Sequence, residues 1–182
     1  MKPLFPKPYA DFVARLRVPC GFVLVAAFAW FSRPDVRSLL YGLPVSLLGL
    51  ALRAWAAGHL AKDRTLATGG PYRYTRNPLY LGTLLVAAGL AIASRGAGLG
   101  ALFAAVFLCI YLPAIQLEQQ HLGSLFPEYA AYAARVPALL PRMTPAGELR
   151  TFQPALYMKN REYQAAGGFL AGAIFLLWKA LR

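Results

Sequence analysis

The segment from Gly69 to Gly82, GGPYRYTRNPLYLG, contains side chains that could bind a small charged molecule. Tyr72 and Tyr80 offer aromatic faces to a cation or to an adenine ring. Arg73 and Arg76 could bind a carboxylate through paired hydrogen bonds. Each residue also has a simpler explanation, because tyrosines are common at membrane interfaces and loop arginines fix membrane topology.

A second polar group begins at Glu118, further along the chain. Its carboxylate could balance an ammonium or sulfonium charge, or accept hydrogen bonds from a ribose. Gln119 is adjacent to it, and Tyr129 and Tyr132 add two more aromatic faces. Together the two groups suit a ligand that carries both a cation and a carboxylate.

Arg53 lies inside an apolar run, where a charge is expensive and should face protein or a water-filled cavity. Gly49 and Ala57 stand four positions to either side, which places small residues on the same helical face. Arg53 could therefore face a site, or it could be a structural arginine bound to helix carbonyls.

Several other kinds of site are not expected. The two histidines, His59 and His121, are too few and too far apart for a metal motif, so we predict no metal. Gly69–Gly70 lacks the Lys-Ser/Thr of a phosphate loop, and no GxGxxG occurs. Cys20 and Cys109 lie in apolar runs, as packing residues do.

The composition indicates how these residues are positioned. Hydrophobic residues make up 58% of the 182, above the share of an ordinary soluble domain, so residues 1–182 are predicted to form one integral membrane domain. The fold class expected is an all-α membrane protein. Five transmembrane helices are predicted, at Val18–Ser32, Ser38–Ala61, Pro78–Ser94, Gly98–Leu117 and Tyr163–Leu181.

The connections between these spans carry further predictions. Asn77 could cap the third span, and Pro78 suits its first position. The third and fourth spans should form an antiparallel hairpin. Residues Leu122–Val136 have the apolar spacing of an amphipathic helix near the interface. Residues 137–155 are long for a connection and should be a functional lid or mobile.

The net charge of +12 is explained by topology. The basic residues flank apolar spans and no nucleic-acid motif is present, so no nucleic-acid partner is expected. With the N-terminus inside, most of them face the cytoplasm, which predicts an inner or plasma membrane protein with a cytoplasmic site. Gly168 and Gly172 have GxxxG spacing, which favours a close helix contact within the chain or in a homodimer.

The segment Gly69–Gly82 resembles the signature G-P-Y-x-x-x-R-[H/N]-P-x-Y-x-G of the isoprenylcysteine carboxyl methyltransferase and phospholipid methyltransferase superfamily. The likeness extends over roughly Arg53 to Pro141, and residues 142–182 are an extra C-terminal segment. Asn77 stands where many members have histidine, although asparagine is a familiar variant, and the chain departs from the pattern at Gln119 and Pro127. The family's acidic pair, Leu, Phe-Gly, two tyrosines and Val-Pro correspond here to Glu118-Gln119, Leu122, Phe126-Pro127, Tyr129, Tyr132 and Val136-Pro137.

The resemblance implies methyl transfer from S-adenosylmethionine, with S-adenosylhomocysteine as product, to a lipid-like or prenylated acceptor that enters from the bilayer. Catalytic roles are expected for Arg53, Arg76 and Glu118. Contact with a substrate is expected at Arg53, His59, Arg161 and Glu162. Contact with the cofactor is expected at Tyr72, Arg73, Arg76, Asn77, Pro78, Tyr80, Gly82, Glu118, Gln119, Tyr129 and Tyr132.

The acceptor and the activity stay open at this point. A carboxylate acceptor needs no base and would use an arginine such as Arg53, Arg76 or Arg161. An amine must lose a proton, and the bases available are Glu118, Glu162 and His121. The alternatives to a methyltransferase are a non-catalytic membrane protein, or a reductase with a nicotinamide cofactor on a related helical scaffold.

Overall fold

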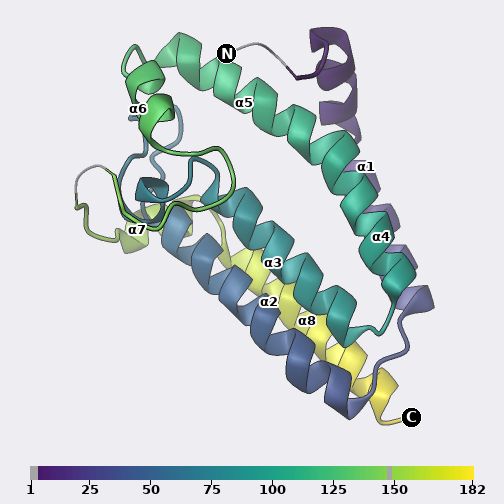
Figure 1. Ribbon diagram of the computed structural model, residues 1–182. Coiled ribbons are helices and arrows are strands. Elements are labelled where there is room, and N and C mark those ends of the chain that lie inside the picture. The colour runs from purple at the N-terminus through teal and green to yellow at the C-terminus, as the bar shows by residue number, and fades with distance from the viewer. Residues whose placement is uncertain (1–3, 147–148) are drawn as a thin grey trace.

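The computed structural model describes residues 4–146 and 149–182, and every regular element in those ranges is helical, as predicted. The long helices form two layers (Figure 1). One layer contains α2 (Val36–Ala57), α3 (Pro78–Ala93) and α8 (Tyr163–Ala180). The other contains α1 (Lys7–Phe31), α4 (Ala97–Val106) and α5 (Leu112–Leu125).

Three helical stretches are long and apolar enough to cross a membrane. They are α1, α2 and the continuous stretch Ala97–Leu125, and α3 is apolar but shorter. A helix is present at each of the five predicted places. Within residues 4–146 and 149–182, α8 is not among the helices that meet both the length and the hydropathy criteria.

Three predicted boundaries were wrong. The first helix begins at Lys7, with Pro8 in its first turn, where a proline is tolerated. The second helix ends at Ala57 and not at Ala61. The helix that contains Glu118 continues to Leu125 because no breaker follows Leu117, so Glu118 lies within α5 and not at its end.

The predicted amphipathic helix over Leu122–Val136 was also wrong. The chain leaves the helical conformation at Phe126 because residues before a proline avoid it, and Pro127 follows. A short helix, α6 (Tyr129–Arg135), then begins. The apolar side of the pattern is still buried, since Tyr129, Tyr132 and Val136 form one cluster with Leu66.

Small residues hold α2 and α3 in close contact. A side chain on Gly49 would collide with the Gly82 carbonyl, and one on Gly89 would collide with the Gly42 carbonyl. The resulting approach lets Ser46 Oγ donate to the Val86 carbonyl at 2.9 Å. Gly82 and Gly89 of α3 therefore lie directly against the α2 backbone.

A π-helical turn, η2 (Phe107–Tyr111), joins α4 to α5. Pro113 follows this turn and has no N–H to donate to the Cys109 carbonyl. The Tyr9 hydroxyl donates to that carbonyl instead, at 2.8 Å. This contact fastens the start of α1 to the middle of the longest helical stretch.

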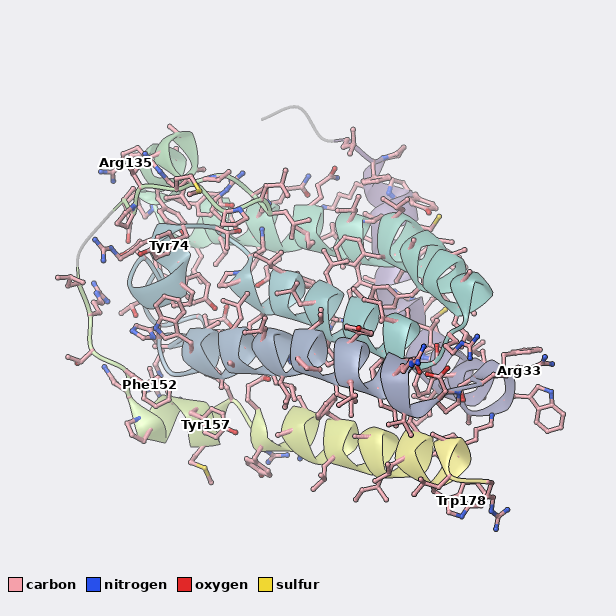
Figure 2. The ribbon with its side chains drawn as sticks, turned by 60° about the horizontal axis from the view of Figure 1, so that its bottom comes forward. Arg33, Tyr74, Arg135, Phe152, Tyr157 and Trp178 are labelled. Atoms are coloured by element: carbon pink, nitrogen blue, oxygen red, sulfur yellow. The ribbon has the colours of Figure 1, made fainter. Side chains whose placement is uncertain are left out.

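The two layers are joined at one end of the bundle. The Arg33 N–H donates to the Ser94 carbonyl at 2.8 Å, and Arg95 Nη1 lies 2.6 Å from Asp35 Oδ2. From this end α3 and the α4–α5 stretch run antiparallel, as predicted, and then diverge (Figure 1). Tyr74 and Arg135 lie at the open end, and Arg33 and Trp178 at the joined end (Figure 2).

Gly168 and Gly172 make no close helix contact within the described chain. A Cβ built at either position meets no atom within 4 Å. The prediction that they pack against a second copy stays a prediction.

Candidate functional site

The signature segment forms a short 3-10 helix, η1 (Gly70–Arg73), followed by a turn into α3. Gly70 has a φ of +54° and a Cβ there would lie 2.7 Å from the His59 ring. Only glycine combines this backbone conformation with so little space. The His59 nitrogens contact the carbonyls of Trp55 and Arg150 at 2.9 and 3.0 Å, so this ring supports the segment from behind.

The chain after α6 lies along the signature segment and is hydrogen-bonded to it. The Arg76 N–H donates to the Pro137 carbonyl at 2.9 Å, and the Arg142 backbone N–H donates to the Tyr74 carbonyl at 3.0 Å. Asn77 does not cap α3, because its Nδ2 donates to the Ala138 carbonyl at 2.7 Å. Of residues 137–155, the described part is therefore partly fixed to the segment, and residues 147–148 lie outside the described residues.

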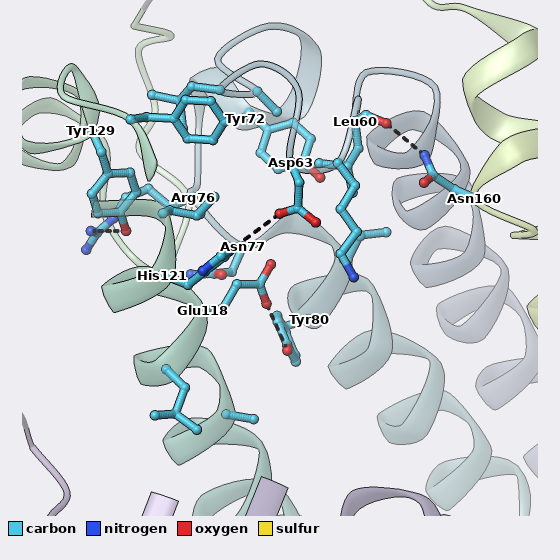
Figure 3. Close-up of a pocket in the computed structure, with 18 of the residues that line it drawn as sticks. Leu60, Asp63, Tyr72, Arg76, Asn77, Tyr80, Glu118, His121, Tyr129 and Asn160 are labelled. Atoms are coloured by element: carbon cyan, nitrogen blue, oxygen red, sulfur yellow. Dashed lines mark hydrogen bonds and ion pairs between the residues drawn. The ribbon is translucent and has the colours of Figure 1, made fainter. Parts of the chain in front are cut away.

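A cavity of about 540 Å³ opens between the signature segment, α5 and α6 (Figure 3). It brings together residues from the two polar groups predicted from the sequence, which are far apart in the chain. The predicted site residues that line it are Tyr72, Arg76, Asn77, Tyr80, Glu118, Tyr129, Tyr132 and Glu162.

Tyr80 and Glu118 connect the two diverging helices across the cavity. The Tyr80 hydroxyl, at the start of α3, donates to Glu118 Oε2 at 3.1 Å. Arg17 of α1 donates to the same hydroxyl at 3.4 Å. This places a carboxylate and an aromatic ring next to each other where the two layers separate.

The tyrosines of α6 bind the signature segment directly. Arg76 Nη1 donates to the Tyr129 hydroxyl at 3.1 Å, and its guanidinium lies 5.9 Å from the centre of that ring. The Tyr132 hydroxyl donates to the Tyr72 carbonyl at 2.8 Å. The two halves of the signature therefore form one wall.

The hydroxyls of this wall are neutral at physiological pH. Burial raises the pKa of Tyr72, and nearby Glu118 raises it further. Burial also raises the pKa of Tyr132. The pKa of Tyr129 is raised by burial, although the Arg76 charge opposes the change. Neutral hydroxyls can donate hydrogen bonds, and the Tyr132 hydroxyl donates one to the Tyr72 carbonyl.

Arg53 does not line the cavity, but it is bonded to a residue that does. Its guanidinium contacts both carboxylate oxygens of Glu162, at 2.7 and 3.0 Å, and donates to Thr83 Oγ1 at 2.5 Å. Asn160 Nδ2 donates to the carbonyls of Ala57 and Leu60, at the end of α2. These bonds hold the turn before α8 against the cavity.

The other predicted residues are placed elsewhere. Gly82 faces Arg53 between α2 and α3. Gln119 lines a separate groove on the opposite side of α5. Arg73, Pro78, His59 and Arg161 also lie outside the cavity lining. Their roles toward cofactor or substrate stay predictions.

Four further residues line the cavity and were not predicted from the sequence: Arg17, Lys62, Asp63 and Asn160. The small number of acidic residues could have indicated where the site lies. The chain has seven of them, and Asp63, Glu118 and Glu162 meet in this one cavity. Across residues 4–146 and 149–182, no group of three or more His, Cys, Asp or Glu side chains is placed to hold a metal ion.

Comparison with known proteins gives a family and two named relatives. A family model described as phospholipid methyltransferase matches residues 43–129. The chain is 38% identical to the cobalt-zinc-cadmium resistance protein CzcN of Cupriavidus metallidurans over 137 residues, which are 70% of this chain and 62% of that protein. The chain thus spans less than two thirds of CzcN.

The second relative is the nickel-cobalt-cadmium resistance protein NccN of Alcaligenes xylosoxydans xylosoxydans. It is 32% identical over 151 residues, which are 76% of this chain and 71% of that protein. No solved structure matches the chain.

Proposed function

The chain belongs to the phospholipid methyltransferase family, and from this premise we propose that it transfers a methyl group from S-adenosylmethionine to an amphiphilic acceptor in the membrane. One observation carries the proposal. Tyr72 and Arg76 of the signature segment share a cavity with Glu118, Tyr129 and Tyr132 of the second polar group. The residues that the family pattern pairs in sequence are thus neighbours in space.

The cavity suits the cofactor in size and in chemistry. Its volume of about 540 Å³ falls within the range usual for small-molecule sites. Tyr72, Tyr80, Tyr129 and Tyr132 supply aromatic surface for an adenine or a cation. Arg76 can bind a carboxylate, and Glu118 can bind an ammonium or a ribose. Bound S-adenosylmethionine supplies an electrophilic methyl group on a sulfonium centre.

The protein's contribution to such a reaction is mainly position and the removal of water. Methyl transfer is an in-line displacement, so orientation of the acceptor dominates catalysis. Tyr80, Glu118 and Arg17 fix the relative position of three helices at the cavity. The α6 tyrosines cover its side toward the loops.

An amphiphilic acceptor can approach from the bilayer. An apolar groove of about 270 Å³ lies between α1, α3 and α4, and is lined by residues such as Leu24, Val86 and Phe103. It shares α1 and α3 with the polar cavity, because Arg17 and Tyr80 line that cavity. In our proposal the acceptor's hydrocarbon part occupies this groove.

The proposed enzyme is an integral membrane protein with five spans. The three long apolar helices, α3 and α8 would cross the membrane, with the N-terminus and the cavity toward the cytoplasm. The support is the distribution of basic residues, since Lys62, Arg64, Arg73, Arg135 and Arg142 all lie at the cavity end of the chain's spans.

The direct test is calorimetry of the purified protein with S-adenosylhomocysteine. We expect binding to one site per chain. A folded protein that binds none would contradict the proposal. Native membranes would then be incubated with radiolabelled S-adenosylmethionine, and base-labile esters separated from stable N-methyl lipids. Cofactor binding without transfer to any lipid, peptide or quinone-like extract would instead support a non-catalytic protein.

The two named relatives suggest a physiological readout. Both are named for resistance to metals, cobalt and cadmium in each case. We propose that methylation of a membrane component by this chain affects sensitivity to these metals. Growth of a deletion strain with cobalt or cadmium, with and without the wild-type chain or the Glu118→Ala variant, tests this. If the wild-type chain and the variant restore growth equally, metal resistance does not depend on Glu118 in the cavity.

A further inference from the structure

We propose that the face of α5 turned away from the polar cavity is the surface on which two copies of this chain associate in the membrane. A groove of about 710 Å³ lies on this face, between α5 and α6. In Figure 1, α5 runs along the edge of the bundle, with the α2–α3–α8 layer on its other side. The described part of the chain therefore leaves this groove open to a partner.

The groove is built on one face of α5. Its α5 residues recur at three- and four-residue spacing, which places them in a single row along the helix. They are Leu112, Ile115, Gln116, Gln119, Gln120 and Gly123. The facing wall on α6 is low, because it consists of small side chains such as Ala130, Ala133 and Ala134. Small residues let a neighbouring helix approach closely in a membrane.

Gln116 shows what an amide on this face does when a partner is within reach. Its Oε1 accepts hydrogen bonds from the N–H groups of Leu4 and Phe5, at 2.6 and 2.8 Å. Its Nε2 donates to the Phe5 carbonyl at 2.9 Å. Both ends of this amide are thus bonded within the chain.

Gln119 and Gln120 lie beside it and have no such partner within residues 4–146 and 149–182. Both belong to the stretch Ala97–Leu125, which is long and apolar enough to cross a membrane. In a membrane, a glutamine amide forms its hydrogen bonds with a neighbouring helix. The two amides therefore call for a polar partner from outside the chain.

Charge selects a second copy as that partner. The chain carries a net charge of +12, so two copies repel each other over most of their polar surfaces. Among the described residues that line the groove there is no Lys, Arg, Asp or Glu. Repulsion between two copies is therefore weakest at this face, and a charged ligand would gain nothing there.

The amides also suit a symmetric pair. A glutamine side chain carries both donors and an acceptor, so it can pair with the same side chain of a copy. A two-fold axis along the bilayer normal places equal positions of the two α5 helices at equal depth. Gln119 and Gln120 of one copy then meet those of the other. A lipid chain would fill the groove without bonding either amide.

The association also reaches the wall of the polar cavity. Tyr129 lines both the groove and that cavity, and its hydroxyl accepts a hydrogen bond from Arg76. A second copy in the groove therefore stands one side chain away from the cavity.

Charge substitution in the groove tests the pairing. Gln119→Glu/Gln120→Glu and Gln119→Lys/Gln120→Lys should each associate at least ~10-fold more weakly than wild type, because like charges meet across the two-fold axis. An equimolar mixture of the two variants should associate again. Energy transfer between donor- and acceptor-labelled full-length chains in phosphatidylcholine vesicles, diluted stepwise with lipid, measures the association.

A matched control separates the groove from a general effect of charge. Gln153 and Gln164 are exposed and lie outside the groove. Gln153→Glu/Gln164→Glu changes the net charge as much as the acidic groove variant does, and it should associate at least as well as wild type.

Disulfide trapping distinguishes this face from the α8 face that contains Gly168. Gly123→Cys and Gly168→Cys are compared in chains whose Cys20 and Cys109 are replaced by alanine. Both positions have room, since a Cβ at Gly123 meets Tyr129 at 3.5 Å and one at Gly168 meets nothing within 4 Å. With copper phenanthroline as oxidant in native membranes, we expect dimers from Gly123→Cys and none from Gly168→Cys.

The inference fails if wild type is monomeric, if either charged groove variant associates as wild type does, or if their mixture stays monomeric. It also fails if only Gly168→Cys is trapped. Thermal unfolding midpoints near that of wild type show that the charged variants are folded, and recovery in the mixture shows it independently. Methyl transfer plays no part in any of these measurements.

Discussion

Arg53 and Glu162, 109 positions apart, form a two-point ion pair in which Nη2–Oε1 is 2.7 Å and Nε–Oε2 is 3.0 Å. Both side chains are largely buried, at 22% and 11% exposure. The pair fastens the turn before α8 to the middle of the α2–α3 contact. It therefore connects the C-terminal segment, which lies outside the family match, to the wall of the cavity.

Removing one partner of this pair should destabilise the fold. Glu162→Ala leaves the Arg53 guanidinium buried without its counter-charge, and we expect a loss of about 2–3 kcal/mol in the free energy of unfolding. The double variant Arg53→Met/Glu162→Leu should lose less than either single variant. Thermal unfolding in detergent measures both. Additive losses would show that the two side chains act independently.

Arg53→Ala should also lower turnover. Asn160 and Glu162, in the turn before α8, line the cavity, and the loss of the bond to Arg53 would displace this turn. The rate of methyl transfer is measured on the fraction of protein that stays folded. A wild-type rate in that fraction would assign Arg53 a structural role only.

Glu118→Ala should weaken S-adenosylhomocysteine binding about tenfold or more, since it removes a carboxylate from the cavity. One variant is a matched control. Glu128 is exposed and lies outside the cavity lining. Calorimetry on Glu128→Ala should give wild-type affinity. Similar losses in both variants would remove the reason to single out Glu118.

Gly89→Ala should destabilise the protein by about 1–3 kcal/mol, because the added methyl group collides with Ser46 and the Gly42 carbonyl. Gly168→Ala is the control, since open space surrounds that position. It should be neutral, or stabilising by up to ~1 kcal/mol through helix propensity. Unfolding midpoints of the two variants decide the matter, and equal midpoints would contradict the close α2–α3 contact.

Alkaline pH should destabilise the cavity wall. Burial raises the pKa of the Tyr132 hydroxyl above its ordinary value, so an unfolded chain ionises this group at a lower pH than the folded chain does. Its contribution to stability is therefore complete below about pH 10 and is lost as the pH rises further. Unfolding midpoints of wild type should fall above about pH 10.

Tyr132→Phe should show a smaller fall over the same range, although its midpoint at neutral pH is reduced by the lost hydrogen bond to the Tyr72 carbonyl. The exposed Tyr41→Phe serves as the control and should follow wild type. A Tyr132→Phe curve parallel to wild type would assign the alkaline loss to other groups.

The sequence by itself determined the helical class, the places of the long helices and the residues of both polar groups. These depend on local properties: apolar runs, glycine and proline positions, and a motif with fixed spacing. It did not determine the end of α5, because no residue near Leu117 marks whether the helix continues. The apolar spacing over Leu122–Val136 also predicted one helix across Pro127, where the chain leaves the helical conformation.

Only the tertiary structure decided which side chains meet. Asn77 has the sequence context of a helix cap, but the Ala138 carbonyl offers its amide a partner from a distant segment. The sequence pattern offered Arg53 no partner, and the fold places Glu162 beside it from 109 positions away. The contact between Asp63 and His121 exists because α3 and α5 diverge and the loop after α2 turns into the space between them. Such contacts depend on helix directions, which no local spacing encodes.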